Sequence, residues 1–432
     1  MKIIKPVFGG YGLGFENSRT HFIEKAVPGD DVIPFIYKKR KKVLYGRIDR
    51  MIESSHARIN PACPCFEQCA GCSYQMLSYE DELKLKRTVF EETVSKLSGI
   101  PCSVSDFIRS ETRFNYRNKI ETSILTDRRG NLSIGFHRRD DWRRVIDIEN
   151  CMLANNSLQE FYRYIRQFFK DNREIIPQEF THFTMRSNRK GEILLVLWFD
   201  NLKTPCSFLD SLNEVQYEKL KGIKAYNIVS SHKRDTSTIQ IYMRGDLIIE
   251  DKYRNYSFAM SPESFFQVNP YITDRITEKL LAVIRKEEPG EVFDLFAGNG
   301  FWGIMASGHV RNITGVEISE LSEKEFYYNQ KANNINNYTF IKTDVRPFLK
   351  ESALMPDMIV LDPPRAGISP RIITRIRDRG ASVIVYISCN PSTLARDLSE
   401  LSGGYSVKDI MLYDMFPNTY HVECVVVLKK NT

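Results

Sequence analysis

The sequence lacks the features of membrane-inserted and secreted chains. No stretch approaches the roughly 20 uninterrupted apolar residues that span a bilayer, so we expect no membrane segment. Residues 1–6 lack the apolar core of a signal peptide, so secretion is not expected either. Internal repeats and low-complexity stretches are also missing. With 432 residues, 42% of them hydrophobic, the chain is expected to be cytoplasmic and to form two or three ordinary domains.

Cysteine, by contrast, is plentiful. Nine cysteines in a chain expected to be cytosolic should not be read as disulfides. Four of them lie within ten residues, at Cys63, Cys65, Cys69 and Cys72, and this density predicts a bound metal. Three isolated cysteines are expected to be ordinary small buried residues: Cys102, Cys206 and Cys424.

The positive charge is moderate but clustered. A net charge of +7 is weak evidence for nucleic acid by itself, because many soluble enzymes carry as much. Two runs concentrate it, residues 38–42 and residues 138–144, and the second run includes Trp142. Such runs suit contacts with phosphate groups. For each run alone, a solvated hairpin loop is an equally good interpretation.

The residue pattern changes twice along the chain, which predicts three domains. Residues 1–55 alternate short β-like runs with glycine turns, as in a small OB-like β-barrel that binds single-stranded nucleic acid. Residues 56–250 hold the cysteine cluster and a mixed α/β pattern, with helices expected at 79–98 and 157–169 and strands at 132–136, 193–199 and 238–243. Residues 251–432 alternate strands and helices, which predicts a doubly wound parallel sheet with strands at 292–295, 313–316, 358–361, 383–387 and 424–428.

Acidic residues follow three successive strands of this last domain. Asp294 opens the glycine-bearing turn 294–300, which departs from the Gly-x-Gly-x-x-Gly spacing of dinucleotide folds. Glu317 and Asp344 end the next two strands, where an acid can accept hydrogen bonds from ribose hydroxyls. The series is typical of S-adenosylmethionine-dependent methyltransferases. Taken singly, Glu317 and Asp344 could equally be loop acids that cap helices.

A cysteine just after a strand is positioned to act as a nucleophile. Cys389 follows the expected strand 383–387 and precedes Asn390-Pro391 at the edge where α/β sheets present their chemistry. One strand earlier stands Asp362-Pro363-Pro364-Arg365. Methyltransferases that act on exocyclic amines carry an aromatic residue after the two prolines, whereas this chain has Arg365. The combination favours carbon over nitrogen as the methyl acceptor.

Seven segments together resemble the RNA uracil-5-methyltransferases, in the iron–sulfur branch with an N-terminal TRAM barrel. The resemblance covers essentially the whole chain. It rests on Cys63-x5-Cys69-x2-Cys72 with Cys151, Tyr116-Arg117-Asn118-Lys119, Ser261-Pro262-x-Ser264-Phe265-Phe266-Gln267-Val268-Asn269, residues 294–300, residues 362–365, Ser388-Cys389-Asn390-Pro391, and Met415-Phe416-Pro417-x-Thr419-x-His421-Val422-Glu423. It implies a multidomain chain with a TRAM barrel, a central α/β domain with an iron–sulfur cluster, and a Rossmann-like methyltransferase domain.

The resemblance also implies a mechanism. Cys389 matches the thiolate that adds to C6 of uracil and so makes C5 nucleophilic enough to accept a methyl group. Glu423 matches the base that removes the C5 proton. Gln267 and Asp362 match residues that orient uracil or the methionine end of the cofactor. The remaining residues expected at the S-adenosylmethionine site are Phe296, Glu317 and Asp344, with Asn299 and Phe301 as further candidates.

For the cysteine cluster, spacing and resemblance point to different metals. Four thiolates suit either zinc or an iron–sulfur cluster, and the short spacings slightly favour zinc. The resemblance instead implies a 4Fe-4S cluster on Cys63, Cys69, Cys72 and Cys151. Two positions depart from the family pattern, because Cys65 and Met76 stand where histidines are common. Cys65 could therefore replace Cys63 as a ligand. The cluster's expected role is structural or in RNA positioning.

The resemblance implies RNA as the partner, with a uridine in a loop of 23S ribosomal RNA as the target. The base would be flipped out of the loop into the catalytic cleft. Transfer RNA is the alternative substrate, and a non-catalytic iron–sulfur RNA-binding protein is the alternative class. A cytosine-5 enzyme is disfavoured, because those enzymes carry a second cysteine where this chain has Arg365. We expect a monomer with no obligate protein partner and no membrane association.

Overall fold

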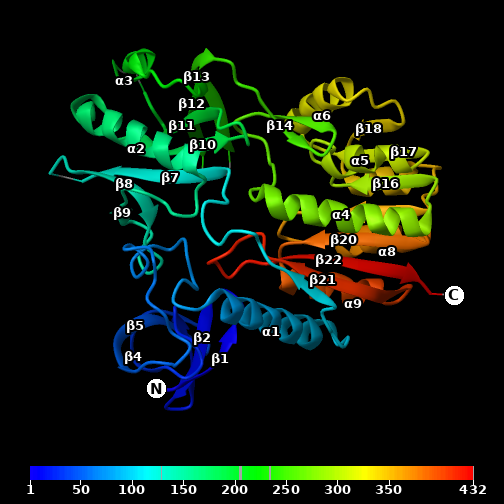
Figure 1. Cartoon of the computed structure of the whole chain (residues 1–432), viewed down its shortest axis with the longest axis horizontal. Coiled ribbons are helices and arrows are strands. Elements are labelled where there is room, and N and C mark those ends of the chain that lie inside the picture. Colours follow the sequence, from blue (N-terminus) through cyan, green and yellow to red (C-terminus); the bar gives the residue numbers. More distant parts are fainter. Residues whose placement is uncertain (128, 204–206, 233–234, 432) are drawn as a thin grey trace. The chain divides into compact units, whose positions relative to one another are not determined.

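The computed structural model describes residues 1–127, 129–203, 207–232 and 235–431 (Figure 1). They form two compact units, each built from separated segments of the chain. The first unit comprises Met1–Pro61, Ser73–Glu111 and Tyr271–Thr432, and the second comprises Ala62–Cys72 and Thr112–Pro270. The domain boundaries at 55 and 250 stay a prediction, and Cys206 lies outside the described residues. None of the helices in these ranges is long and apolar enough to cross a membrane.

The N-terminal part of the first unit is a small β-rich domain, as predicted. Its five strands are β1 (Ile3–Val7), β2 (Tyr11–Glu16), β3 (Arg19–Glu24), β4 (Asp31–Arg40) and β5 (Val43–Glu53), in the order β1-β2-β3-β5-β4. A bridge between Lys2 and Asp31 joins the two outer strands, so the sheet closes on itself. Closure leaves no free edge and encloses a small apolar core that includes Ile3, Ile23 and Val32.

The rest of the first unit is built on an eight-stranded sheet, to which residues 106–108 contribute one edge strand. Its order is β18-β17-β16-β19-β20-β22-β21-β6, and the first five strands are parallel, as predicted. The strands are β6 (Asp106–Ile108), β16 (Glu291–Leu295), β17 (Asn312–Glu317), β18 (Tyr338–Lys342), β19 (Met358–Leu361), β20 (Val383–Ser388), β21 (Tyr405–Tyr413) and β22 (Glu423–Lys430).

The prediction of a wholly parallel sheet is wrong for β22, which runs antiparallel to both β20 and β21. The reason lies in the connection. The chain leaves β21 and returns directly through residues 414–422, with no crossover helix between them. Only an antiparallel strand can be joined in this way, because a parallel one needs a crossover of a dozen or more residues.

Helices cover this sheet and bury its apolar core. Residues from α1, α7, α8 and α9 share one core with β16, β19, β20 and β22, and α1 packs against α9. The helices are α1 (Tyr79–Ser98), α4 (Pro270–Glu287), α5 (Phe301–Ala306), α6 (Glu320–Ala332), α7 (Val345–Glu351), α8 (Pro370–Arg379) and α9 (Pro391–Leu401). Figure 1 shows α4 running along the sheet near β16 and β20.

The second unit is built on a seven-stranded sheet with the order β13-β12-β11-β10-β7-β8-β9. Its strands are β7 (Lys119–Thr126), β8 (Leu132–His137), β9 (Val145–Asp147), β10 (Phe180–Ser187), β11 (Ile193–Asp200), β12 (Leu220–His232) and β13 (Asp235–Gly245). The other elements are β14 (Ile249–Tyr253), β15 (Tyr256–Met260), α2 (Asn156–Asp171) and α3 (Ser207–Ser211). Helix α2 buries Phe161, Ile165 and Phe169 in this unit's core, so the predicted helix at 157–169 is confirmed.

Candidate active site

The carboxyl edge of the first unit's sheet gathers most of the expected site residues. Parallel strands end at a common edge, and Asp294, Glu317, Asp362 and Cys389 lie at or just after the ends of β16, β17, β19 and β20. Strand β22 starts at the same edge, because Ser388 pairs with Cys424 in the antiparallel register. The residues next to this pair are Cys389 and Glu423. The direction of β22 therefore brings the expected nucleophile and base together.

Asp294 is buried beneath the turn that follows β16. Its Oδ2 accepts hydrogen bonds from the backbone N–H of Gly303 at 3.0 Å and from the hydroxyl of Tyr338 at 2.7 Å. Burial raises the pKa of this carboxyl to about 7. Its other oxygen, Oδ1, has no hydrogen-bond partner in the described structure. Tyr338, which fixes the carboxyl, could not be picked out from the sequence, where it reads only as a strand aromatic.

Glu317 ties the glycine-bearing turn to the end of β17. Its Oε2 accepts from the N–H of Gly298 at 3.2 Å, and its Oε1 accepts from Ile318 at 2.8 Å and Ser319 at 2.9 Å. It does not cap α6, whose N-cap is Ser319. The capping interpretation is therefore wrong for Glu317, and its carboxylate is held at the edge where an acid can meet a ribose.

Asp344 does cap a helix. Its Oδ1 accepts from the N–H of Arg346 at 2.8 Å at the N-terminus of α7, and its side chain is exposed. The capping interpretation, weighed from the sequence, is thus confirmed for this residue. A cap of this kind occupies one carboxylate oxygen, so a role in cofactor binding stays a prediction.

The turn between β16 and α5 contains an unpaired buried donor. The side chain of Asn299 is 6% exposed, and its Nδ2 has no hydrogen-bond partner in the described structure. Phe296 adopts a left-handed backbone with φ of 62°, and Phe301 is buried. A buried polar group without a partner costs about 1–3 kcal/mol. Asn299 and the free oxygen of Asp294 therefore fit a polar ligand that supplies both an acceptor and a donor.

Asp362 is held by an aromatic side chain from the helix after the turn. The indole Nε1 of Trp302 donates to Asp362 Oδ2 at 2.8 Å. Burial raises the pKa of Asp362 to about 6. Sequence reasoning missed Trp302; its position just after the glycine-bearing turn was the available signal.

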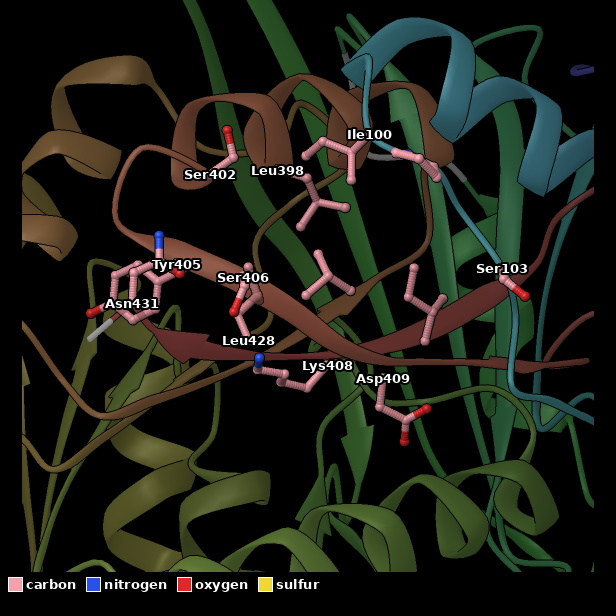
Figure 2. A pocket seen from close by; sticks show the side chains of 13 residues that line it. Ile100, Ser103, Leu398, Ser402, Tyr405, Ser406, Lys408, Asp409, Leu428 and Asn431 are labelled. Atoms are coloured by element: carbon pink, nitrogen blue, oxygen red, sulfur yellow. The ribbon is translucent and has the colours of Figure 1, made fainter.

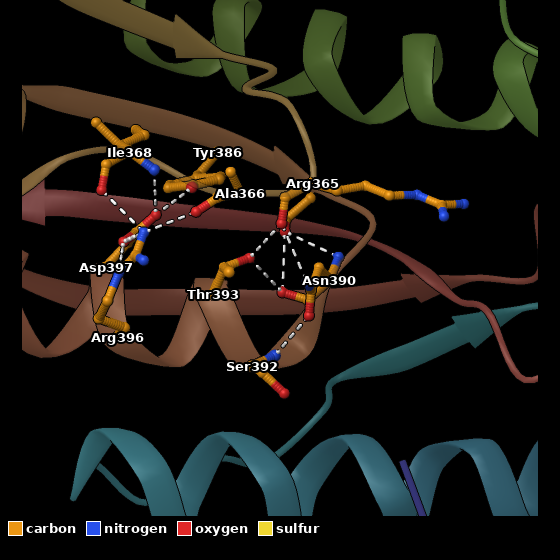
Figure 3. Close-up of polar contacts among 10 residues, drawn as sticks. Arg365, Ala366, Ile368, Tyr386, Asn390, Ser392, Thr393, Arg396 and Asp397 are labelled. Carbon is orange, nitrogen blue, oxygen red and sulfur yellow. Dashed lines mark hydrogen bonds and ion pairs between the residues drawn. The ribbon is translucent and has the colours of Figure 1, made fainter. Parts of the chain in front are cut away.

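The start of α9 fixes the loop that follows Asp362 (Figure 3). The side-chain amide of Asn390 donates to the carbonyl of Arg365 at 3.0 Å, and the hydroxyl of Thr393 donates to the same carbonyl at 3.2 Å. Arg396 donates to the carbonyl of Ile368 at 2.9 Å. In Figure 3 the side chain of Arg365 extends away from these contacts. The loop carrying Arg365 and the turn carrying Cys389 are therefore held as one piece.

A buried carboxylate completes this connection. Asp397 is fully buried, and its Oδ2 accepts from the N–H of Ile368 at 2.8 Å and from the hydroxyl of Tyr386 at 2.8 Å. Its Oδ1 lies 2.7 Å from the guanidinium of Arg396. The carboxylate thus links β20, α9 and the loop after β19. None of these partners was expected from the sequence.

Burial and neighbouring charges shift the pKa values of both Cys389 and Glu423. Burial, followed by the negative charge of Glu423, raises the pKa of the Cys389 thiol to about 12, and Arg365 opposes both effects. Glu423 is 4% exposed, and burial followed by the charge of Asp362 raises its pKa well above its usual range. Arg365 again opposes the shift. The pKa values of the thiol and of the carboxyl beside it are thus both raised, and one arginine favours the ionised form of each.

The expected metal ligands all lie in the second unit. The cysteines in the described ranges are not joined by disulfides. Burial raises the pKa of Cys151, and the charge of Cys63 adds to this shift. Burial also raises the pKa of Cys65, and the charge of Cys63 and a hydrogen bond with Cys63 add to this second shift. The buried guanidinium of Arg117 interacts with the thiolates of Cys151 and Cys72. The donor chemistry therefore suits a thiolate-bound metal. However, the part of the chain that the structure describes contains no group of three such residues already arranged to hold an ion.

Gln267 also belongs to the second unit, where two of the motif segments meet. Its backbone carbonyl accepts from the side chain of Asn118 at 3.0 Å, and the N–H of Asn118 donates to the carbonyl of Val268 at 3.1 Å. Gln267 itself is buried. Its role in binding the cofactor or uracil stays a prediction.

A cavity of about 470 Å³ lies far from these groups, at the other end of α9 (Figure 2). It is bounded by Ile100 and by the end of α9 and start of β21, including Ser402 and Tyr405. Helix α9 has 11 residues, and at about 1.5 Å per residue it separates the two ends by roughly 16 Å. The cavity is therefore not part of the site around Cys389.

Comparison with known proteins agrees with this geometry. The model of the family described as tRNA (uracil-5-)-methyltransferase matches residues 78–431. The chain belongs to this family. The enzyme is therefore an RNA methyltransferase that uses S-adenosylmethionine and acts on C5 of uracil.

Similar proteins match along nearly their whole length. A protein of Clostridium tetani described as an uncharacterized RNA methyltransferase is 30% identical over 97% of the enzyme and 93% of its own length. A second such protein, from Caldanaerobacter subterraneus, is 30% identical over 100% and 98%. The solved structure of Pyrococcus abyssi tRNA (uracil-54, C5)-methyltransferase with S-adenosyl-L-homocysteine superposes with a TM-score of 0.76 at 25% identity, covering 99% of the enzyme and 100% of that chain.

Proposed function

We propose that the enzyme methylates C5 of a loop uridine in 23S ribosomal RNA through a covalent bond between Cys389 and C6. The observation that carries the proposal is the antiparallel pairing of β22 with β20, which sets Glu423 beside Cys389. Burying an acid next to a thiol costs free energy of folding. Groups whose pKa values are shifted in this way cluster at functional sites. Nucleophile and base are the two functions that methylation of a uracil carbon requires.

The reaction would proceed in three steps. The Cys389 thiol releases its proton to solvent and Sγ bonds to C6, and the electrons of the C5–C6 double bond move to O4 as an enolate. C5 then takes the methyl group that S-adenosylmethionine supplies, and the bonding pair stays on the cofactor's sulfur. Ionised Glu423 removes the proton from C5 and passes it to solvent, the double bond reforms, and the Cys389 thiolate leaves and takes up a proton again. The products are 5-methyluridine, S-adenosylhomocysteine and one proton.

Cofactor binding is proposed for the residues around the turn after β16. Support comes from the unpaired polar atoms of Asp294 and Asn299 and from the anchored carboxylate of Glu317. We propose the same role for the other residues predicted from the sequence: Gln267, Phe296, Phe301, Asp344 and Asp362.

Ribosomal RNA as substrate is supported by the barrel and the cysteine motif. We propose that residues 1–55 form a TRAM domain that binds RNA, and that Cys63, Cys69, Cys72 and Cys151 hold a 4Fe-4S cluster. Anaerobically purified protein should then contain iron and sulfide in equal amounts, and Cys63→Ser should lose both while Cys65→Ser keeps them. Zinc in place of iron would contradict the cluster.

Transfer RNA is the second candidate substrate. It is favoured by the Pyrococcus abyssi structure, whose protein acts on a tRNA uracil. The two candidates share the chemistry at Cys389 and differ only in which RNA is bound.

The test uses anaerobically purified enzyme, S-adenosylmethionine with a labelled methyl group, and separately purified unmodified ribosomal and transfer RNA. We expect label in 5-methyluridine of ribosomal RNA, lost in Cys389→Ala and retained in the control Cys102→Ala. We also expect Glu423→Gln to accumulate a protein–RNA adduct that survives denaturation, because elimination needs the base. Label in transfer RNA alone would overturn the substrate, and a fully active Cys389→Ala would overturn the covalent step.

A further inference from the structure

The hairpin between β8 and β9 ends in a tip that carries charge and one large aromatic side chain. This hairpin tip, residues 138–144, contains four arginines, two aspartates and Trp142. Trp142 is 75% exposed. The chain has only two other tryptophans: Trp302 is buried, and Trp198 stacks between His182 and Tyr226. Trp142 is therefore the one tryptophan of the three whose side chain is largely exposed to water.

The tip is braced by hydrogen bonds between its own residues on either side of Trp142. The guanidinium of Arg138 donates two hydrogen bonds to Asp140, each at 2.8 Å. The N–H of Arg138 donates to the carbonyl of Arg144, and the N–H of Arg144 donates to the carbonyl of Asp141, each at 3.0 Å. A bridge between Cys69 and Arg138 also ties the base of the tip to the cysteine loop. Trp142 is thus presented on a defined scaffold.

The exposed arginines suit phosphate groups. Arg143 and Arg144 are 76% and 71% exposed and lie 3.3 and 3.7 Å from Asp141. Exposed ion pairs of this kind contribute little to stability, so a phosphate can replace the aspartate at small cost. An indole face stacks on any unpaired base, which contributes roughly 1–3 kcal/mol per base. One exposed aromatic side chain followed by two exposed cations is a combination that suits single-stranded RNA.

We infer that the hairpin tip 138–144 is an RNA clamp, in which Trp142 stacks on an unpaired base and Arg143 and Arg144 contact the adjacent phosphates. The inference rests on RNA being the substrate and holds for ribosomal or transfer RNA. A protein partner could also use exposed tryptophan and arginine. The net charge of the tip, +2 from four arginines and two aspartates, favours the polyanion.

The test measures binding of the full, anaerobically purified chain to an unmodified stem–loop transcript with a uridine-containing loop. A fully paired duplex with the same stem serves as the comparison probe. Trp142→Ala should weaken stem–loop binding about tenfold or more, Trp142→Phe should restore most of it, and duplex binding should change little. Binding should quench tryptophan fluorescence in the natural chain but not in Trp142→Phe.

The arginines are tested through the salt dependence of binding. The double change Arg143→Gln/Arg144→Gln should reduce the slope of log affinity against log salt by about 1.4, because each single-strand phosphate contact contributes roughly 0.7. The matched control is Arg173→Gln in the same unit, an exposed arginine (64%) that is also paired with a neighbouring acid, Glu174. It should leave the slope unchanged.

Unchanged stem–loop affinity in Trp142→Ala, together with an unchanged slope in the double variant, would overturn the clamp and leave a protein partner as the function of the tip. Failure of the proposed methylation is a separate result, because binding is measured without turnover. Where methylation occurs, the clamp variants should raise KM and leave kcat unaltered. A fall in kcat at saturating RNA would contradict a role confined to binding.

Discussion

At the scale of single residues, the reactivity of Cys389 depends on the charges beside it. A thiol with a pKa near 12 is almost wholly protonated at neutral pH, and only the thiolate attacks carbon. Glu423 and Arg365 shift this equilibrium in opposite directions. The two side chains therefore control how much of Cys389 is present as the reactive thiolate.

Substitution of Glu423 and substitution of Arg365 should change the alkylation rate of Cys389 in opposite directions. Glu423→Gln removes the charge that raises the pKa of Cys389, so the thiol should be alkylated by iodoacetamide several-fold faster at pH 9. Arg365→Met removes the charge that lowers this pKa, so alkylation should be slower. Mass spectrometry of the peptide containing Cys389 gives both rates. Cys102 has its pKa raised to about 11 by burial and by Glu91, and it serves as the internal control. An equal change in the alkylation rate of Cys102 would contradict the assigned effects of Glu423 and Arg365. So would changes in the alkylation rate of Cys389 that have the same sign in both variants.

Asp294 makes the stability of the ligand-free first unit depend on pH. Its folded pKa of about 7 lies above the unfolded value near 4, so between these values the unfolded chain releases a proton that the folded chain keeps. Stability should therefore fall as pH rises from 4 to 7, by up to about 4 kcal/mol, and then level off. Asp294→Asn should remove this part of the fall and leave the parts due to Asp362 and Glu423, whose pKa values are also raised, as measured by urea unfolding at pH 4.5 and 7.5.

The control for this prediction is Asp344→Asn at the same edge of the sheet. Asp344 is exposed and caps α7, and asparagine caps a helix as well as aspartate does. Its replacement should leave the pH dependence as it is. If Asp294→Asn retained the full decline between the two pH values, another group would have to carry it.

At the scale of elements, α1 holds the connection that leads to Glu423. Lys86 Nζ lies 2.7 Å from Glu82 Oε1 and 2.7 Å from Asp414 Oδ1, and all three side chains are buried. Glu82 also accepts from the N–H of Asn418 at 2.7 Å. Residues 414–422 run directly into β22, so this buried cluster fixes the position of Glu423 at the start of that strand. Lys86 is thereby a positioning residue.

Lys86→Met should leave two carboxylates buried without their cation. Breaking a buried pair in this way destabilises by about 3–5 kcal/mol, so the unfolding midpoint of the first unit should fall clearly. The control is Lys5→Met, which removes the exposed partner of Glu92 on the same helix and should cost less than about 1 kcal/mol. At temperatures where both variants are folded, Lys86→Met should also lower kcat more than KM. Equal midpoints for the two variants would exclude this role for α1.

Local patterns make some elements predictable to the residue. Helix α1 is predicted at 79–98 and is observed at Tyr79–Ser98, because Ser78 accepts from the N–H of Asp81 and Gly99 ends the helix with φ of 72°. Strands buried on both faces read as apolar runs, so β16, β17, β19 and β20 are also predictable. Cys389 and Glu423 are identified by motif, and their proximity follows once β22 is known to reverse.

What the sequence does not predict depends on contacts between distant residues. The direction of β22 is decided by a connection without a helix. The bond from Trp302 to Asp362 and the pair Lys86–Asp414 join positions far apart in the chain. Asp344 shows a different limit of sequence reasoning. An acid after a strand fits both a cofactor ligand and a helix cap, so the sequence alone could not decide between the two roles.

At the scale of the whole molecule, the chain divides its tasks between two units made of interleaved segments. The first holds the carboxyl edge with Asp294, Glu317 and Cys389, whereas the second holds the cysteine loop, Gln267 and the hairpin tip. Gln267 is expected from the sequence to bind the cofactor as part of the domain 251–432, and the structure places it in the second unit. Whether the first unit alone binds the cofactor therefore has to be tested on the whole chain.

Amide hydrogen exchange measured with and without S-adenosylhomocysteine shows which segments the ligand protects. At a concentration of 100 Kd the ligand stabilises the state that binds it by about 2.7 kcal/mol, so amides at the site should exchange up to roughly a hundredfold more slowly. We expect protection of residues 294–303 and 317–319, and of the peptide containing Gln267 as its predicted role requires. Peptides from the hairpin tip 138–144 are the internal control and should exchange as before. Protection limited to the carboxyl edge would exclude Gln267 from cofactor binding and leave it to the uracil, whereas protection that omits residues 294–303 would overturn the site proposed around Asp294.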